Sequence, residues 1–259
     1  MRTKTRIISL FLLFAMALIT LSVVPATAAT FTNPLGDGAD PWVIKAGGKY
    51  YWCGSDGNDT IFIVENTKLQ NLFSNPNYQI VFKAPANQPY SKEIWAPELH
   101  FADGRWYIYF CGSDGNNVNH RMFVLEGGSN SNNPLDGSYS YKAKISDSTD
   151  KWGIDGTTFV YNNQRYYVWS GWEGDTNIRQ NIYIAKMNNP WTISSSRVEI
   201  SRPDYDWEKV GDPDVNEGPQ VLIKNGKVHV IYSASGSWTD DYCLGRITYS
   251  SGDIMNKSN

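Results

Sequence analysis

The chain has 259 residues, of which 41% are hydrophobic and 19% charged, with 10 Trp, 16 Tyr and 10 Phe. This composition is that of a globular protein and excludes a disordered or fibrous one. A formal charge of −3 provides no basic surface for phosphate backbones, which argues against a nucleic-acid partner. The aromatic residues favour stacking on neutral ligands instead.

The first 28 residues predict a secretory signal peptide, followed by a single domain over 29–259. Three basic residues precede an apolar run over 7–24, and small residues at 25–28 are typical of a signal peptidase site. An uncleaved membrane anchor is the alternative, because the apolar run is long for a signal. We expect cleavage, and therefore a secreted, extracellular protein with no membrane contact afterwards.

The remaining sequence repeats one pattern four times, at intervals of about 60 residues. Each copy has an acidic residue, a short apolar strand, a turn containing Gly or Asn, and an aromatic strand. The copies cover 40–54, 98–112, 155–171 and 217–233. Third strands are expected at 61–64, 121–125 and 182–185. Four-stranded units of this kind predict an all-β propeller.

The number of blades is left open by the length of the chain. From Asp40 to Asn259 there is room for just under four units of this size. The alternatives are a four-bladed ring or a larger ring that has lost its end. In the second case apolar faces would be open to water, so we expect instability or self-association, and weak activity, of the isolated chain.

The repeated acidic residues are Asp40, Glu98, Asp155 and Glu217. The innermost strand of each blade runs along the axis of a propeller, so acids at one phase of the repeat are expected at one level of the channel. Singly, each acid has a structural alternative, because such residues are common in turns. Together they favour function, since converging carboxylates repel one another. Carboxylates in an aromatic pocket suit glycoside hydrolysis.

Several aromatic residues are candidates for stacking on sugar rings, with core packing as the alternative for each: Trp42, Trp95, Trp152, Trp169 and Trp172. The acidic aromatic segment 204–208 is interpreted either as a rim of the substrate site or as an ordinary loop. Cys53 and Cys111 occupy equivalent positions in neighbouring repeats, so we expect core thiols there and no disulfide between them.

Four segments together resemble glycoside hydrolase family 43, the arabinanase, arabinofuranosidase and xylosidase family. They are Asp40-Pro41-Trp42, Ile94-Trp95-Ala96-Pro97-Glu98, Gly153-Ile154-Asp155-Gly156 and Asn216-Glu217-Gly218-Pro219. The resemblance covers nearly all of the predicted domain, in order and with the family's spacing. The stretches 172–185 and 189–192 are similar to the arabinofuranosidase branch of the family.

The resemblance implies a five-bladed β-propeller, of which this chain would hold about four blades, and a C-terminally incomplete domain. It also implies hydrolysis with inversion of configuration. Asp40 would be the general base, Glu217 the general acid, and Asp155 the residue that tunes and orients the acid. The substrate-binding residues would be Trp42, Trp95, Glu98 and Trp172.

The resemblance implies no required cofactor. A structural calcium is possible in the family beside a histidine of the fifth blade, but His100, His120 and His229 do not occupy that position, so no metal ligand is assigned. The implied function is an exo-acting α-L-arabinofuranosidase on plant cell-wall arabinan or arabinoxylan, monomeric if the ring closes. The alternatives are a β-xylosidase, an endo-arabinanase, or a carbohydrate-binding propeller that is inactive because its fifth blade is missing.

Overall fold

The computed structural model describes residues 32–256 and residue 258. The signal peptide expected at 1–28 lies outside the described residues and stays a prediction. Within the described part the fold is all-β, as the repeats predict. Sixteen strands are joined by loops and by three 3-10 turns, η1 (Leu69–Asn71), η2 (Asn117–Asn119) and η3 (Asp206–Glu208). None of the helices among these residues is long and apolar enough to cross a membrane.

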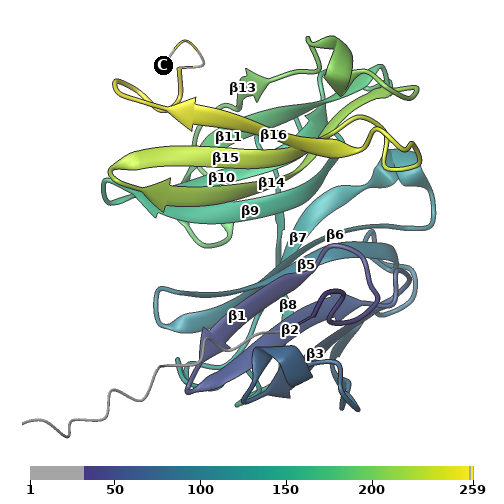
Figure 1. Cartoon of the computed structure of the whole chain (residues 1–259), viewed down its shortest axis with the longest axis vertical. Coiled ribbons are helices and arrows are strands. Elements are labelled where there is room, and N and C mark those ends of the chain that lie inside the picture. The colour runs from purple at the N-terminus through teal and green to yellow at the C-terminus, as the bar shows by residue number, and fades with distance from the viewer. Residues whose placement is uncertain (1–31, 257, 259) are drawn as a thin grey trace, which may run out of the picture. The chain divides into compact units, whose positions relative to one another are not determined.

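The strands form four units, here called blades I to IV (Figure 1). Blade I contains β1 (Trp42–Ala46), β2 (Lys49–Ser55), β3 (Thr60–Asn66) and β4 (Gln79–Lys83). Blade II contains β5 (Lys92–Ala102), β6 (Arg105–Ser113), β7 (Arg121–Glu126) and β8 (Ser140–Ile145). Blade III contains β9 (Gly153–Tyr161), β10 (Gln164–Trp172) and β11 (Arg179–Asn189), with β12 (Thr192–Ile193) and β13 (Val198–Ser201) both paired to β11. Blade IV contains β14 (Asp214–Lys224), β15 (Lys227–Ala234) and β16 (Cys243–Tyr249). The third strands expected from sequence lie within β3, β7 and β11.

The turn between the first two strands explains why every blade begins with a hairpin. Each turn has two central residues with positive φ, as in Asp103 (48°) and Gly104 (81°) of blade II and Asn225 (53°) and Gly226 (73°) of blade IV. This backbone matches the twist of the flanking strands and is favoured by Gly, Asn and Asp. The four sequence copies therefore fold as four antiparallel hairpins.

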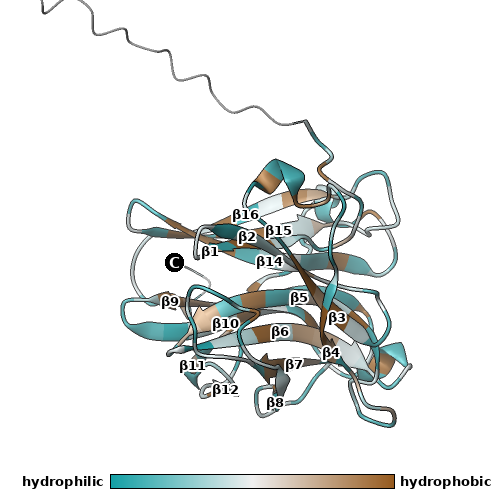
Figure 2. Ribbon diagram, turned by 90° about the horizontal axis from the view of Figure 1, so that it is seen from below, coloured by the Kyte–Doolittle hydropathy of each residue, from teal (hydrophilic) through white to brown (hydrophobic). Residues whose placement is uncertain are grey.

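Hydrophobic cores lie between successive blades, and Figure 2 shows that the hydrophobic residues lie mostly along the strands. Ile61 of blade I belongs to the same buried cluster as Phe110 of blade II. Similar clusters join blades II and III, and blades III and IV. Cys53 and Cys111 are buried free thiols, as expected from the sequence.

Blades III and IV also share main-chain hydrogen bonding. The start of β11 pairs in parallel with the start of β14, where Gln180 lies opposite Val215. The strands of these two blades consequently belong to one sheet, whereas blades I and II form two separate four-stranded sheets.

Candidate active site

A cavity of about 1070 Å³ lies where the first strands of the four blades meet. Its lining includes all four repeated acids, namely Asp40, Glu98, Asp155 and Glu217. These residues are far apart in the sequence and come from four different blades. The structure therefore brings together the carboxylates that the repeat pattern singled out.

A local irregularity of the inner strands places these carboxylates. In β9, Asp155 and Gly156 together lie opposite the single residue Trp169, and comparable register shifts occur in β5 and β14. Such bulges redirect side chains and are frequent next to active sites. Asp40 (φ 47°) and Asp155 (φ 56°) also adopt left-handed backbone, which costs a non-glycine residue roughly 1 kcal/mol or more.

The four acids line one cavity although their register positions within the hairpins differ. Glu217 pairs directly with Ser233 of the neighbouring strand. In blade III the residue equivalent to Ser233 is Ser170, which pairs with Ile154. Asp155 therefore lies one residue further along its strand than Glu217 does. Glu98 is displaced further, opposite Tyr109. The bulges compensate for these offsets, because a strand with an extra residue turns the next side chain toward the cavity.

Burial and mutual repulsion control the charges in the cavity. Burial raises the pKa of Asp40. The pKa of Asp155 is raised well above its usual range, first by burial and then by the charges of Glu217 and Asp40. The pKa of Glu217 is also raised, mainly by burial, and the charge of Asp40 adds to this effect. Asp155 and Glu217 therefore retain a proton at higher pH than isolated carboxyl groups would.

Two hydrogen bonds orient this pair. The Gly218 amide donates to Oδ2 of Asp155 at 3.0 Å, which ties Asp155 to the strand that carries Glu217. The Tyr242 hydroxyl donates to Oε1 of Glu217 at 3.0 Å. This second bond favours the ionised carboxylate and therefore partly opposes the effect of burial on the pKa of Glu217.

Glu98 has a more complete set of partners than the other cavity acids. Nε2 of His100 lies 2.8 Å from one carboxylate oxygen, and the side-chain amide of Gln220 donates to the other. The indole of Trp42 packs against His100, with ring centroids 4.6 Å apart, and its N–H donates to the Leu99 carbonyl. Glu98 therefore holds one wall of the cavity in place.

The tryptophans expected at the site divide into two groups. Trp42, Trp95 and Trp152 line the cavity. Trp172 does not: it is buried and stacked on Trp152, with centroids 4.8 Å apart and planes 9° apart. The expectation that Trp172 contacts substrate is corrected accordingly, because Trp152 occupies the cavity side of the stack. Trp169 is a core residue between blades II and III.

The segment 204–208 is an anchored loop, and its last residue is not part of the cavity lining. Glu208 is fully buried and its carboxylate accepts hydrogen bonds from four donors. One donor is the side chain of Asn216, the residue before Glu217. Glu208 fixes the loop to β14. At this residue the interpretation of the segment as a rim of the substrate site is therefore not supported.

Sequence reasoning missed the residues that the β15–β16 loop contributes. Trp238 and Tyr242 both line the cavity, and Tyr242 contacts Glu217 directly. Neither belongs to the repeated hairpin pattern. Their position in the sequence was the signal that could have found them. The loop that follows the second strand of a blade lies at the same end of the sheet as the acid.

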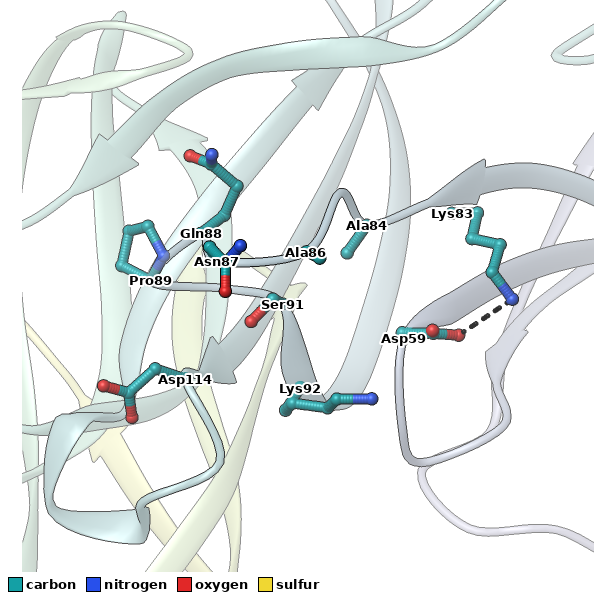
Figure 3. A pocket seen from close by; sticks show the side chains of 10 residues that line it. All are labelled: Asp59, Lys83, Ala84, Ala86, Asn87, Gln88, Pro89, Ser91, Lys92 and Asp114. Atoms are coloured by element: carbon teal, nitrogen blue, oxygen red, sulfur yellow. Dashed lines mark ion pairs between the residues drawn. The ribbon is translucent and has the colours of Figure 1, made fainter.

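A second cavity, of about 760 Å³, is formed by the β4–β5 loop and two neighbouring turns (Figure 3). Lys83 and Asp59 form an ion pair there at 3.5 Å, while Asp114 accepts hydrogen bonds from Asn119. No aromatic ring lines this cavity. The carboxylate-lined cavity is therefore the candidate active site.

A structural calcium needs several oxygen ligands close together. Across 32–256 and 258, no group of three or more His, Cys, Asp or Glu side chains is placed to hold a metal ion. His100 pairs with Glu98, and His120 is buried beneath Trp95 with its ring centroid 4.1 Å away. These donors do not fit a calcium site.

This chain is similar to known proteins over most of its length. Residues 31–254 match glycosyl hydrolases family 43. The chain is 41% identical over 256 residues to an extracellular exo-α-(1→5)-L-arabinofuranosidase of Streptomyces avermitilis, covering 94% of this chain and 52% of that protein. It is 39% identical over 214 residues to α-L-arabinofuranosidase 43 of Humicola insolens, covering 81% and 43% respectively. The chain thus spans about half the length of these curated relatives.

Solved structures show the same architecture. The crystal structure of an α-L-arabinofuranosidase from Lactobacillus brevis matches with a TM-score of 0.80 at 32% identity, covering 88% of this chain and 73% of that chain. An endo-arabinase from Bacteroides thetaiotaomicron matches with a TM-score of 0.69 at 17% identity, covering 88% and 82%, and shares the fold. The four described blades are therefore those of a propeller of this family.

Proposed function

We propose that this chain is an inverting α-L-arabinofuranosidase that removes terminal arabinofuranosyl residues. The proposal starts from its family, because this chain belongs to glycosyl hydrolases family 43. The observation that carries the proposal is the cavity in which Asp40, Asp155 and Glu217 converge with raised pKa values. The names of the two curated relatives and of the Lactobacillus brevis structure support the choice of arabinose as the released sugar.

Glu217 is the general acid in this proposal. Its carboxyl group is half-buried and close to the charge of Asp40, so it holds a proton at a pH where an exposed glutamate would be ionised. Asp155 orients the acid in this proposal, because the Gly218 amide ties Asp155 to the strand that carries Glu217. The proton passes from Glu217 to the glycosidic oxygen as the bond to the sugar breaks.

Asp40 is the general base in this proposal, carried into the cavity lining by the segment that precedes β1. Its carboxylate removes a proton from a water molecule, whose oxygen attacks the anomeric carbon from the face opposite the leaving group. Inversion requires room for that water, and the acids of an inverting enzyme are about 6.5–9.5 Å apart. Because Asp40 and Glu217 belong to different blades, ring geometry sets this separation.

Trp42, Trp95 and Glu98 form the substrate-binding wall. The indole faces of the two tryptophans offer flat apolar surfaces for the C–H groups of a sugar ring. Glu98 is held by His100 and Gln220 and can accept a sugar hydroxyl. Neither this wall nor the general acid needs a cofactor.

The substrate in this proposal is arabinan or arabinoxylan of the plant cell wall, encountered outside the cell. The basic and apolar pattern of the first 28 residues supports secretion. So does the likeness to a Streptomyces avermitilis protein whose name describes it as extracellular.

The experiment that tests the proposal compares hydrolysis of α-1,5-arabinooligosaccharides, linear arabinan and aryl β-xylosides by the purified protein. Release of arabinose alone, from chain ends, and an inverted anomer in proton NMR of the first product are expected. Release of xylose would show that the protein is a β-xylosidase instead. Release of internal fragments would show that it is an endo-arabinanase. Sugar binding without hydrolysis would indicate a carbohydrate-binding propeller, and a retained anomer would contradict the roles of Asp40 and Glu217.

A further inference from the structure

The β15–β16 loop presents an indole ring in an unusual way. Trp238 is 61% exposed, whereas the core residue Trp169 is 3% exposed. The exposed surface of Trp238 is not simply external, since the residue lines the carboxylate cavity. An apolar ring of this size gains little from water, so its exposure on a cavity wall needs an explanation.

The other face of the ring rests on glycine backbone. A β-carbon at Gly236 would lie 2.5 Å from the Trp238 ring, and one at Gly211 would lie 3.2 Å from it. Gly211 also has a φ of 115°, which other residues rarely adopt. Both positions therefore require glycine if the indole is to lie where it does.

Hydrogen bonds fix the turn that carries the ring. The Gly236 amide donates to the Val210 carbonyl at 2.7 Å, which joins this loop to the segment before β14. Thr239 closes the turn, because its amide and its hydroxyl both donate to the Gly236 carbonyl, at 2.9 Å and 2.8 Å. The indole is thus held in place before any ligand arrives, which lowers the entropic cost of stacking on it.

The position of the ring relative to the acid indicates which sugar it meets. The same loop continues to Tyr242, whose hydroxyl contacts Glu217. A general acid lies beside the oxygen of the leaving group, so the sugar beyond that oxygen lies on the Glu217 side of the cavity. Asp40 and Trp42, by contrast, belong to blade I, so they line the cavity from a different blade than Glu217 does.

We propose that Trp238 is the stacking platform for the leaving-group sugar, a pentose ring that follows the cleaved bond. The indole ring of Trp238 packs against the C–H face of that sugar and aligns the glycosidic oxygen with Glu217. This inference rests on the proposed function, and it adds a binding subsite on blade IV and a determinant of preference for oligosaccharides over simple glycosides.

The test compares α-1,5-arabinotriose with methyl α-L-arabinofuranoside, whose leaving group has no ring. Trp238→Ala is expected to lower kcat/KM for arabinotriose about tenfold more than for the methyl glycoside, in line with roughly 1.5 kcal/mol for loss of an aromatic contact. Trp238→Phe should recover most of the difference. Trp207→Ala is the matched control, since Trp207 is 43% exposed in η3, the turn that precedes blade IV, but does not line the cavity.

Equal losses on the two substrates would overturn the proposal, because they would show that Trp238 only supports the loop that holds Tyr242. Binding is measured separately, by titrating Glu217→Gln protein with arabinotriose, with and without Trp238→Ala. If the protein hydrolyses neither substrate, the proposed function fails; loss of arabinotriose binding on Trp238→Ala would still uphold the platform. Unchanged binding would refute it.

Discussion

Glu208 of η3 and Glu217 of the following strand, β14, are close in the sequence, yet their surroundings differ. Glu208 is fully buried and accepts hydrogen bonds from the amides of Asp204 and Tyr205 and from the side chains of Asn216 and Tyr232. Glu217 faces the cavity and, among the described residues, accepts a hydrogen bond from Tyr242 alone. One carboxylate is saturated with donors and the other is not.

The difference separates a structural acid from one available for chemistry. Four donors compensate Glu208 for the loss of water and leave it no capacity for a substrate. Glu217 also loses water, but its one hydrogen-bond donor in the described part of the chain is the Tyr242 hydroxyl and the charge of Asp40 lies nearby, so its pKa rises and it keeps a proton to give. Burial alone therefore does not identify a catalytic acid, whereas burial with few donors does.

The largest expected effect comes from removing the proton of Glu217. Glu217→Gln should lower kcat on arabinooligosaccharides about a thousandfold, because the leaving oxygen then receives no proton. Substrates with dinitrophenyl leaving groups need no such proton and should be much less affected. Steady-state kinetics on the two substrate types measure this, with thermal unfolding as a control for folding. Equal loss on both types would remove Glu217 from the acid role.

Glu208→Gln should affect stability and not the proton-transfer step. The glutamine amide would place N–H groups opposite donors that now bind a carboxylate, at a cost of about 3 kcal/mol. This corresponds to a fall in Tm of roughly 6–12 °C, measured by calorimetry. Asp206→Asn, at an exposed position of the same loop, is the matched control. An unchanged Tm for Glu208→Gln would show that the four hydrogen bonds are not needed.

Tyr242→Phe makes the contrast sharper by taking the remaining donor from Glu217. The hydrogen bond favours the ionised carboxylate, so its loss should raise the pKa of Glu217 further. A general acid works while protonated, and the alkaline limb of the kcat/KM profile should therefore move to higher pH, with less than about a tenfold change at the optimum. Tyr249→Phe, which lies outside the cavity lining, serves as the control. A profile that shifts to lower pH, or does not shift, contradicts this arrangement.

The smallest effect concerns the stability cost of the charged cluster. The pKa of Asp155 is raised on folding, so its contribution to stability is present below the unfolded-state value and is lost as pH rises through the folded-state value. Asp155→Asn removes this loss while keeping an oxygen for the Gly218 amide. The variant should have a Tm that exceeds that of the wild type by roughly 2–4 °C at neutral pH and by less near pH 4. Thermal scans across this range measure the difference, and a gap that does not depend on pH would contradict the assignment.

The sequence predicts the repeated parts of the molecule well because they obey simple rules. Two-residue turns such as Asp103-Gly104 favour hairpins, and the recurrence of an acid in each repeat indicates which side chains meet. The third strands and the buried thiols Cys53 and Cys111 follow from the same periodicity. These features depend on local backbone preferences and on the packing of similar units.

Features that depend on a single tertiary contact were not accessible in this way. Trp152 and Trp172 have similar sequence surroundings, and only their stacking order decides that Trp152 faces the cavity. Glu208 resembles a surface residue until η3 turns it inward. Tyr242 reaches Glu217 through a loop outside the repeat. In each case the side chain's role follows from a neighbour distant in sequence, which periodicity does not encode.

The parallel pairing of β11 with β14 affects how the site fluctuates. Blades III and IV share a hydrogen-bonded sheet, so amide exchange through opening of that sheet requires breaking bonds common to both. Asp155 and Glu217 therefore travel together in slow opening motions, while Asp40 belongs to the separate sheet-and-loop unit of blade I. We therefore expect the distance between Asp40 and Glu217 to vary more in such motions than the distance between Asp155 and Glu217.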